Sequence, residues 1–217
     1  MRAEDILIKG LRELDVTCSS EQISAFMTYL SELKKWNRAY NLTALKKDED
    51  IIIKHFLDSL LYIKAFPEGK LRLIDAGTGA GFPGVPIGIV RPEINITLIE
   101  SSRKKTAFLR HMTRSLNLAD LKVLEQRLET LGKEHEKSYD LIVSRATFSI
   151  SEFLKMACRY AKEDGKLILN KGPKLSEELK IPGAAEAVRE VLSFRLPIIH
   201  DERNLVVLEC KKNSDKP

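Results

Sequence analysis

The sequence predicts an α/β protein in which a mostly parallel, seven-stranded sheet follows a helical N-terminal region. Three observations lead to this prediction. Residues 1–66 carry apolar residues at helical spacing, without strand-like alternation. From about residue 71 onward, short apolar runs alternate with helical stretches, as in parallel sheets. Two final apolar runs are joined by only a few turn residues, so we expect them to pair as an antiparallel hairpin.

Three amphipathic helices are expected in the N-terminal region, within ILIKGLREL, ISAFMTYLSELKKW and DIIIKHFLDSLLYIKAF. Each segment places apolar residues at i, i+3, i+4 and i+7. Residues 19–22 (SSEQ) suit the N-cap of the second helix, and the acidic residues 48–50 favour the start of the third. Residues 67–69 (PEG) then break the pattern, so the helical region ends there.

Beyond this break the pattern becomes that of alternating strands and helices. The expected parallel strands lie in LRLIDA, ITLIE, LKVLEQ, YDLIVS and KLILN. The helices between them are expected at about residues 84–91, 102–117, 127–136 and 150–162, with a further one around SEELKIPGAAEAVRE. The hairpin comprises VLSFRLPII and RNLVVLECK, joined at residues 200–202. Five parallel strands followed by such a hairpin are the arrangement of Rossmann-like methyltransferases.

The composition indicates a folded protein of the reducing cytoplasm. No apolar run reaches the roughly 18–20 residues that cross a membrane, and the first residues lack the apolar core of a signal peptide. Cys18, Cys158 and Cys210 lie far apart without a CxxC pair, so neither a disulfide nor a zinc site is expected. The net charge of +5 permits nucleic-acid binding without requiring it.

The stretch LRLIDAGTGAGFPG places four glycines within eight positions after the first expected strand. Gly79, Gly81 and Gly84 match the GxGxxG pattern of dinucleotide-binding proteins. Gly77, Gly79 and Gly81 match the GxGxG pattern of methyltransferases. Asp75 ends the strand, and its carboxylate would attract the ammonium and sulfonium of S-adenosylmethionine but repel a pyrophosphate. The sequence therefore favours the class I S-adenosylmethionine-dependent methyltransferase fold over a nicotinamide-dependent dehydrogenase.

Further candidate residues stand at the ends of later strands. Glu100 ends the second strand, where an acid usually binds ribose hydroxyls, although it also suits a cap of the next helix; Ser101 beside it is a further cofactor candidate. Arg145 ends the fourth strand, where its guanidinium suits guanine O6, a phosphate or a cofactor carboxylate, or else a structural pair with an acid. Lys171 follows beside the same cleft. A ring nitrogen such as guanine N7 needs orientation rather than a general base.

Two N-terminal segments carry polar residues with alternative roles. In WNRAYNLTAL, an aromatic ring beside amides suits an unpaired base, or Asn41 and Thr43 bond the backbone of a helix-ending turn. His55 and Asp58 lie at i and i+3 on one helix face, where an interdomain hydrogen bond is favoured over an RNA contact. A metal site would need further ligands, and none is expected.

Several motifs appear in order along the chain: NLTAL, HFLDSL, DAGTGAGFPGVPIGIVRPE, IESSRKKTAFLR, QRLE, SRA and NKG. Together they resemble the bacterial rRNA small-subunit methyltransferase G family, also called glucose-inhibited division protein B. The resemblance covers about residues 20–210. It implies a helical region on a Rossmann-like domain, which uses S-adenosylmethionine to form 7-methylguanosine in the 530 loop of 16S rRNA.

The resemblance also implies roles for single residues. Cofactor contacts are implied at Gly77 and Phe82, at Leu128 and Glu129 beside the adenine, and at Arg145, which closes the site. RNA or base contacts are implied at the remaining matched positions, which are Asn41, Lys104, Lys105, Arg127 and Lys171.

From these observations we expect a helical region at 1–66, a methyltransferase domain at 67–212 and a polar tail at 213–217. The expected partner of this monomer is 16S rRNA or the small ribosomal subunit. The alternative is a methyltransferase of the same fold that acts on another RNA or on a small molecule.

Overall fold

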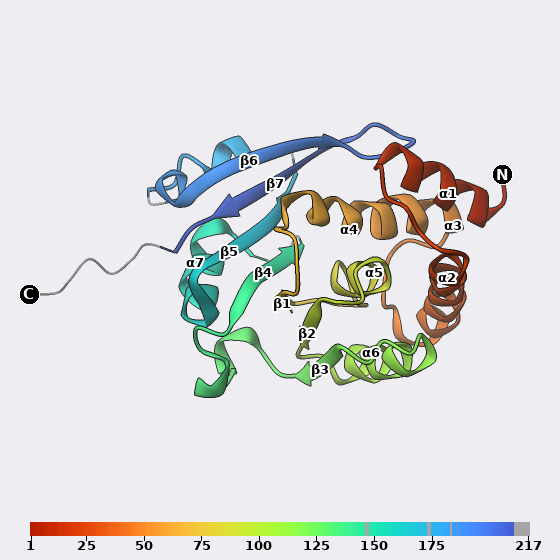
Figure 1. Cartoon of the computed structure of the whole chain (residues 1–217), viewed down its shortest axis with the longest axis horizontal. Helices are drawn as coiled ribbons and strands as arrows, with labels where there is room; N and C mark the ends of the chain where they lie inside the picture. Colours follow the sequence, from red (N-terminus) through yellow and green to blue (C-terminus); the bar gives the residue numbers. More distant parts are fainter. Residues whose placement is uncertain (146–147, 173–174, 183, 211–217) are drawn as a thin grey trace, which may run out of the picture.

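The computed structural model describes residues 1–145, 148–172, 175–182 and 184–210. Its centre is a seven-stranded sheet in the order β3-β2-β1-β4-β5-β7-β6 (Figure 1). The strands are β1 (Arg72–Ala76), β2 (Asn95–Glu100), β3 (Leu121–Glu125), β4 (Tyr139–Arg145), β5 (Ala161–Lys171), β6 (Val188–Arg195) and β7 (Glu202–Leu208). Strands β1 to β5 pair in parallel, and β7 is antiparallel to both β5 and β6. The predicted sheet with its terminal hairpin is confirmed.

The three predicted N-terminal helices are also present. The first two are α1 (Ala3–Glu13) and α2 (Ser20–Tyr40), and the third is composed of α3 (Asp48–Ile51), η1 (Ile52–Leu57), α4 (Asp58–Leu60) and η2 (Leu61–Ala65). Ser19 caps α2 as expected, because its hydroxyl accepts from the Gln22 N–H at 3.3 Å. The sequence did not predict that η1 is π-helical, a form that is rare and frequent at functional sites.

Helices α5 (Gly84–Val90), α6 (Arg103–Ser115) and α7 (Ile150–Ala157) lie where helices were predicted. The helix expected at 127–136 is wrong: the segment forms two 3₁₀ turns, η3 (Leu128–Thr130) and η4 (Lys133–His135), with Gly132 between them. The helix expected at 150–162 is too long, because η5 (Cys158–Tyr160) ends it and β5 begins at Ala161. Glycine weakens a helix through its backbone freedom, and Gly132 marks the break in the first of these two segments.

The helix expected around SEELKIPGAAEAVRE is wrong as well. Only α8 (Leu175–Glu178) and the 3₁₀ turn η6 (Ala185–Ala187) are helical there, and β6 already begins at Val188. Pro182 explains the break, because proline lacks the N–H that a helix requires and disfavours a helical residue before it. The last strands are shorter than predicted, and residues 196–201 form the hairpin turn.

The N-terminal helices share one hydrophobic core with a face of the sheet. The Tyr29 ring of α2 stacks 5.1 Å from Phe56 of η1 and 5.5 Å from Phe82, which follows β1. A second core, which includes Tyr139, Phe153 and Leu167, fills the space between the other face and α7. Figure 1 shows α1 and α2 at one end of the molecule and α7 at the other.

The prediction that no disulfide forms is wrong. Cys158 and Cys210 are disulfide-bonded, whereas Cys18 is free. Cys158 follows α7, which packs on β5, and Cys210 follows β7, which pairs with β5. The fold thus brings together two cysteines that are 52 residues apart, and no sequence pattern predicts that they pair. The predicted tail at 213–217 lies outside the described residues, among which no helix is long and apolar enough to cross a membrane.

Candidate functional site

The glycine-rich loop leaves β1 at Ala76 and enters α5 at Gly84. Gly77, Gly79 and Gly81 have φ angles of +67°, +63° and +103°, the left-handed region that glycine adopts without strain. Gly84 is instead the first residue of α5, where a Cβ would meet the Asp75 carboxylate at 2.8 Å. The three glycines of the GxGxG pattern therefore shape the turn, and Gly84 serves helix packing.

Asp75 is fully buried beneath this loop. Its Oδ2 accepts hydrogen bonds from the Thr78 hydroxyl at 2.5 Å and the Gly84 N–H at 2.7 Å. Its Oδ1 is the one buried side-chain oxygen or nitrogen without a hydrogen-bond partner in the described part of the chain. Burial raises the pKa of Asp75 to about 7. A cation near Oδ1 would favour the carboxylate form of this residue.

Glu100 bonds both the glycine loop and the following helix. Its Oε2 accepts from the Gly79 N–H at 3.0 Å, and its Oε1 accepts from the N–H of Ser102, the N-cap of α6, at 2.8 Å. The structure therefore contains the helix-capping alternative, while a contact of Glu100 with a ribose stays a prediction.

A cleft of about 390 Å³ opens beside the loop. The predicted residues that line it are Gly77, Glu100, Ser101, Lys105, Arg127, Leu128 and Glu129. The sequence missed four others, Ile99, Gln126, Phe148 and Met156. Ile99 and Gln126 each open a quoted motif, IESSRKKTAFLR and QRLE, without having been assigned a role, and Phe148 and Met156 carried no signal beyond hydrophobicity. The cleft combines carboxylates with apolar side chains.

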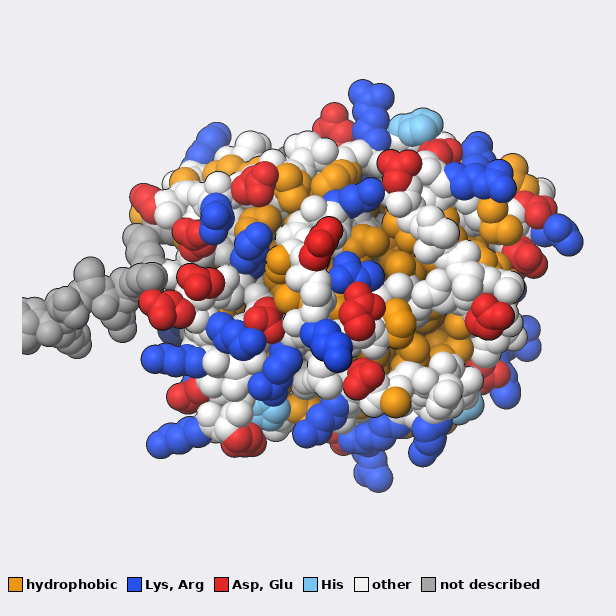
Figure 2. Space-filling model, in the orientation of Figure 1, with side chains coloured by type: hydrophobic (Ala, Val, Ile, Leu, Met, Phe, Trp, Pro, Cys, Tyr) orange, Lys and Arg blue, Asp and Glu red, His pale blue; other side chains and the backbone are white. Residues whose placement is uncertain are grey.

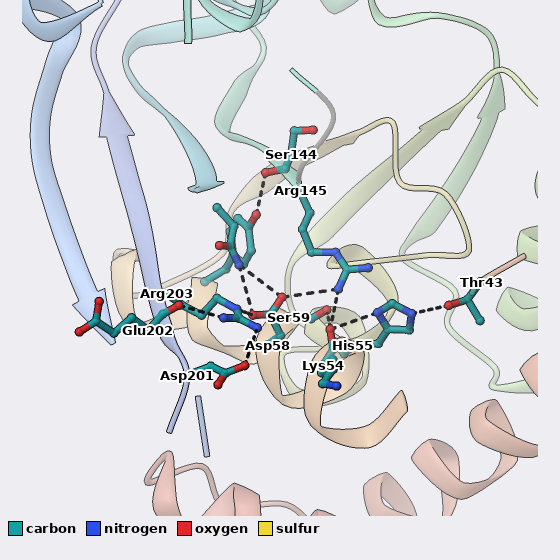
Figure 3. A network of polar contacts seen from close by, with 12 residues as sticks. Thr43, Lys54, His55, Asp58, Ser59, Ser144, Arg145, Asp201, Glu202 and Arg203 are labelled. Carbon is teal, nitrogen blue, oxygen red and sulfur yellow. Dashed lines mark hydrogen bonds and ion pairs between the residues drawn. The ribbon is translucent and has the colours of Figure 1, made fainter. Parts of the chain in front are cut away.

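Arg145 does not line this cleft but lies over the ring of Phe82, with 5.0 Å between its guanidinium carbon and the ring centroid. Its Nη1 donates to the Lys54 carbonyl of η1 at 3.0 Å (Figure 3). His55 stacks on the same Phe82 ring at 4.4 Å. The π-helical turn and the glycine loop thus jointly position the guanidinium.

Asp58 connects this cluster to the C-terminal strands (Figure 3). Its carboxylate, which is 4% exposed, lies 3.5 Å from Arg145 Nη1 and accepts from Arg203 Nε at 2.8 Å. The amide of Asn170 on β5 donates to it at 3.3 Å. The interdomain contact expected for the helix face of His55 and Asp58 is present, and the acid expected as a structural partner of Arg145 is Asp58.

His55 uses both ring nitrogens within the protein. Nε2 lies 2.7 Å from the Thr43 hydroxyl, and Nδ1 lies 3.1 Å from the Lys54 carbonyl. Burial, followed by the positive charge of Arg145, lowers the pKa of His55 to about 3. The ring is therefore neutral near neutral pH, and a direct RNA contact of His55 stays a prediction.

Lys171 does not line the cleft, and its ammonium contacts neighbouring groups instead. Its Nζ donates to the Phe148 carbonyl at 2.6 Å and pairs with Glu178 of α8 at 2.9 Å. These contacts fasten α8 to the segment that precedes α7. A role for Lys171 in orienting a base stays a prediction.

The turn after α2 holds the other N-terminal candidates. Asn41 ends the helix with a left-handed backbone, at φ 49°. The Asn37 side chain bonds the Thr43 N–H at 2.9 Å and the Thr43 carbonyl at 3.0 Å. These bonds match the helix-ending-turn alternative for this segment. Asn41 itself lines a separate groove, so its role as an RNA contact stays a prediction.

The three basic residues expected to contact RNA, Lys104, Lys105 and Arg127, lie at different places. Lys105 lies in the cleft, 3.8 Å from Glu100, whereas its neighbour Lys104 lies over the ring of Tyr40 at 6.0 Å. Arg127 is exposed at the rim of the cleft, 3.8 Å from Glu129. Figure 2 shows Lys and Arg side chains along the lower edge of this face, over β3 and α6. In the described ranges, no three His, Cys, Asp or Glu residues are grouped to hold a metal ion.

Comparison with known proteins gives consistent results. The family model for rRNA small subunit methyltransferase G matches residues 22–206. The protein of that name from Geotalea uraniireducens is 41% identical over 212 residues, which cover 95% of this chain and 96% of that protein. The protein of the same name from Acetivibrio thermocellus is 36% identical over 215 residues, with coverages of 96% and 89%.

Solved structures agree on the fold. A precorrin-6Y C5,15-methyltransferase from Geobacter metallireducens aligns with a TM-score of 0.56 and 14% identity, covering 80% of this chain and 92% of that chain. A SAM-dependent methyltransferase from Aquifex aeolicus aligns with a TM-score of 0.55 and 18% identity, with coverages of 83% and 98%. Identities this low show the fold alone, and the predicted class I methyltransferase fold is confirmed.

Proposed function

The chain belongs to the rRNA small subunit methyltransferase G family, and on that premise we propose that it uses S-adenosylmethionine to methylate N7 of a guanine in the 530 loop of 16S rRNA. The observation that carries the proposal is the arrangement around the glycine loop. The loop residue Gly77 lines the cleft, and Arg145 lies over Phe82 of the same loop. We further propose that the enzyme acts as a cytoplasmic monomer on the rRNA or the small subunit.

The residues of the cleft suit S-adenosylmethionine. Its ammonium and sulfonium are cations, which the nearby carboxylates of the cleft, Glu100 and Glu129, attract; the unpartnered Oδ1 of Asp75 adds an acidic oxygen beneath the loop, outside the cleft lining. Glu100 and Glu129 suit ribose hydroxyls, while Leu128 and Phe148 suit the adenine ring. When bound, the cofactor supplies a methyl group on a sulfonium, which a nitrogen lone pair accepts without a general base. These residues bind and orient it.

Arg145 supports guanine as the acceptor. An N–H donor of its guanidinium can bind guanine O6, which leaves the in-plane lone pair of N7 free for attack on the methyl group. The guanidinium is already fixed by the Lys54 carbonyl and Asp58, so little entropy is lost on binding. Since N7 already carries this lone pair and needs no general base, orientation and proximity supply most of the catalysis.

The experiment that tests the proposal is transfer of a labelled methyl group to 16S rRNA and to small subunits that lack the modification. We expect label in 7-methylguanosine after digestion to nucleosides. Label in another nucleoside or in no RNA would overturn the proposed acceptor. Calorimetric titration with S-adenosylmethionine and with NAD tests the cofactor separately. Binding of NAD instead of S-adenosylmethionine would mean that the loop follows the GxGxxG pattern and not the GxGxG pattern.

Arg145→Ala is expected to lower the single-turnover rate of methyl transfer by about 100-fold, the typical effect of misplacing a reacting group. Arg159→Ala is the matched control, since Arg159 pairs with Glu136 on the surface. An unchanged rate in Arg145→Ala would show that this arginine does not orient the acceptor.

A further inference from the structure

A second surface, separate from the cleft, lies where α2 ends. It contains a groove of about 700 Å³ between the end of α2 and the segment that follows it. Among its lining residues are three cations, Lys34, Arg38 and Lys46, and no Asp or Glu. We call this groove, together with the neighbouring Tyr40 and Lys104, the α2-end surface.

Cations of the groove are available to a ligand. Lys34 pairs with Asp48 at 2.5 Å, but Arg38 and Lys46 are exposed and form no ion pair with any residue that the structure describes. Exposed, unpaired cations in a concave site favour anions, above all the phosphates of a nucleic acid. Asn41 lies in the same groove and offers amide hydrogen bonds.

Tyr40 adds an aromatic ring next to this groove. Tyr40 is 43% exposed, whereas the other four tyrosines, all of which lie in the described residues, are buried. One side of the ring packs on Trp36 at 5.5 Å, and Trp36 is itself held by Phe108 and His111 of α6. Lys104 Nζ lies over the ring at 6.0 Å, so an unpaired base that stacks on the exposed part of the ring also meets this cation.

The groove is linked to the candidate site by side-chain contacts. Thr43 lines the groove, and its hydroxyl bonds His55 at 2.7 Å. His55 stacks on Phe82, over which Arg145 lies. Three side-chain contacts therefore connect the groove to the guanidinium that we assign to the acceptor base.

We propose that the α2-end surface binds a single-stranded segment of the RNA substrate next to the methylated guanine. Arg38 and Lys46 contact its phosphates, and Tyr40 with Lys104 holds one unpaired base. This inference rests on the proposed function, because it takes RNA as the substrate. It extends the RNA interface beyond the residues at the glycine loop.

Filter binding of full-length variants to a small-subunit rRNA fragment and to small subunits, over a range of salt, tests this surface. The double variant Arg38→Glu/Lys46→Glu is expected to lose at least about 10-fold in affinity, and its salt dependence should flatten by about 0.7 per lost phosphate contact. Tyr40→Ala should weaken binding about fivefold or more, whereas Tyr40→Phe keeps the ring and the affinity. Affinity for S-adenosylmethionine serves as the test of correct folding.

The matched control is Lys70→Glu/Lys122→Glu, which makes the same charge change on exposed residues at the amino ends of β1 and β3. If both double variants lose affinity equally, net charge rather than the α2-end surface governs binding, and the inference fails. It also fails if Tyr40→Ala binds like Tyr40→Phe. Binding is measured without methyl transfer, so a wild type that binds RNA but does not methylate it would contradict the proposed function alone.

Discussion

At the scale of single residues, Asp58 of the N-terminal helical region contacts residues of three strands. Its carboxylate contacts Arg203 on β7, Asn170 on β5 and Arg145 on β4. The residue is 4% exposed, so water screens these contacts little. A buried carboxylate between two guanidinium groups compensates both charges, and its loss leaves them facing each other.

Asp58→Asn is therefore expected to destabilise the protein by about 3 kcal/mol, the lower end of the cost of breaking a buried pair, since Arg203 is partly exposed. The measurement is urea unfolding at neutral pH. Asp50→Asn is the matched control: Asp50 pairs with Lys54 on the surface, where solvent screens the pair and its loss changes stability little. Equal losses in the two variants would contradict the role given to Asp58.

Two buried groups near the glycine loop respond to acid in opposite directions. The pKa of His55 is lowered from 6.5 to about 3, so the unfolded chain takes up this proton first and stability falls as the pH drops below 6.5. The pKa of Asp75 is raised from 3.8 to about 7, so the folded protein takes up this proton first. The stability that protonated Asp75 contributes is therefore present at acid pH and is lost as the pH rises toward 7.

The Asp75→Asn variant removes one of these opposing effects. Its stability should fall more steeply than that of the wild type between pH 7 and pH 5, by at most about 1.4 kcal/mol per pH unit. The measurement is the free energy of unfolding in urea at a series of pH values. Asp164→Asn, at an exposed position, should track the wild type. Parallel profiles for Asp75→Asn and wild type would contradict a raised Asp75 pKa.

At the scale of elements, the glycine loop contains two glycines with different constraints. A Cβ on Gly79 would meet nothing within 4 Å, so alanine there adds only the strain of a left-handed backbone. A Cβ on Gly81 would lie 2.6 Å from Val85 and 2.7 Å from the Tyr29 hydroxyl, at a φ of +103°. Alanine at Gly81 must therefore displace the aromatic cluster beneath the loop.

Gly81→Ala is expected to destabilise the protein by about 3 kcal/mol and Gly79→Ala by about 1 kcal/mol, because only the first adds overpacking to backbone strain. Thermal unfolding of the pair measures the difference. If Gly79→Ala is less stable than Gly81→Ala, contacts other than those around Tyr29 determine the shape of the loop.

Helices and strands with a strong periodic pattern were predictable from the sequence. Segments in which a glycine or proline interrupts the helix were not. The helix α2 has both a capping box and apolar spacing, and its prediction is confirmed. The false helix near Pro182 shows that a breaker outweighs helix-forming neighbours. The π-helical η1 depends on tertiary contacts such as that of Lys54 with Arg145, which no local pattern encodes.

The candidate site was predictable where its residues follow strand ends, since the ends of parallel strands meet at one edge of a sheet. Gly77 and Glu100 are examples, and both line the cleft. Arg203 was not predicted, because it becomes relevant only when β7 lies beside β5 and faces Asp58. The disulfide was missed for the same reason.

At the scale of the whole molecule, the N-terminal helices and the sheet form one cooperative structure. They share a core, and the tip of the β6–β7 hairpin also reaches α1, where the Ile198 N–H donates to Glu13 at 2.9 Å. Figure 1 shows the hairpin at the edge of the sheet, with its tip beside α1. The Tyr29 hydroxyl of α2 donates to the Ala80 carbonyl of the glycine loop at 2.5 Å.

We therefore expect a single unfolding transition. Trp36, the one tryptophan of the chain, packs between α2 and α6 and reports on the N-terminal helices by fluorescence. Its midpoint in urea should coincide with that of far-ultraviolet circular dichroism, which reports on the entire fold. Tyr29→Phe leaves the buried Ala80 carbonyl without its donor and should shift both midpoints together, by about 1–3 kcal/mol in stability. An earlier fluorescence transition would show that the helical region unfolds on its own, because Trp36 would then leave α6 while the sheet persisted.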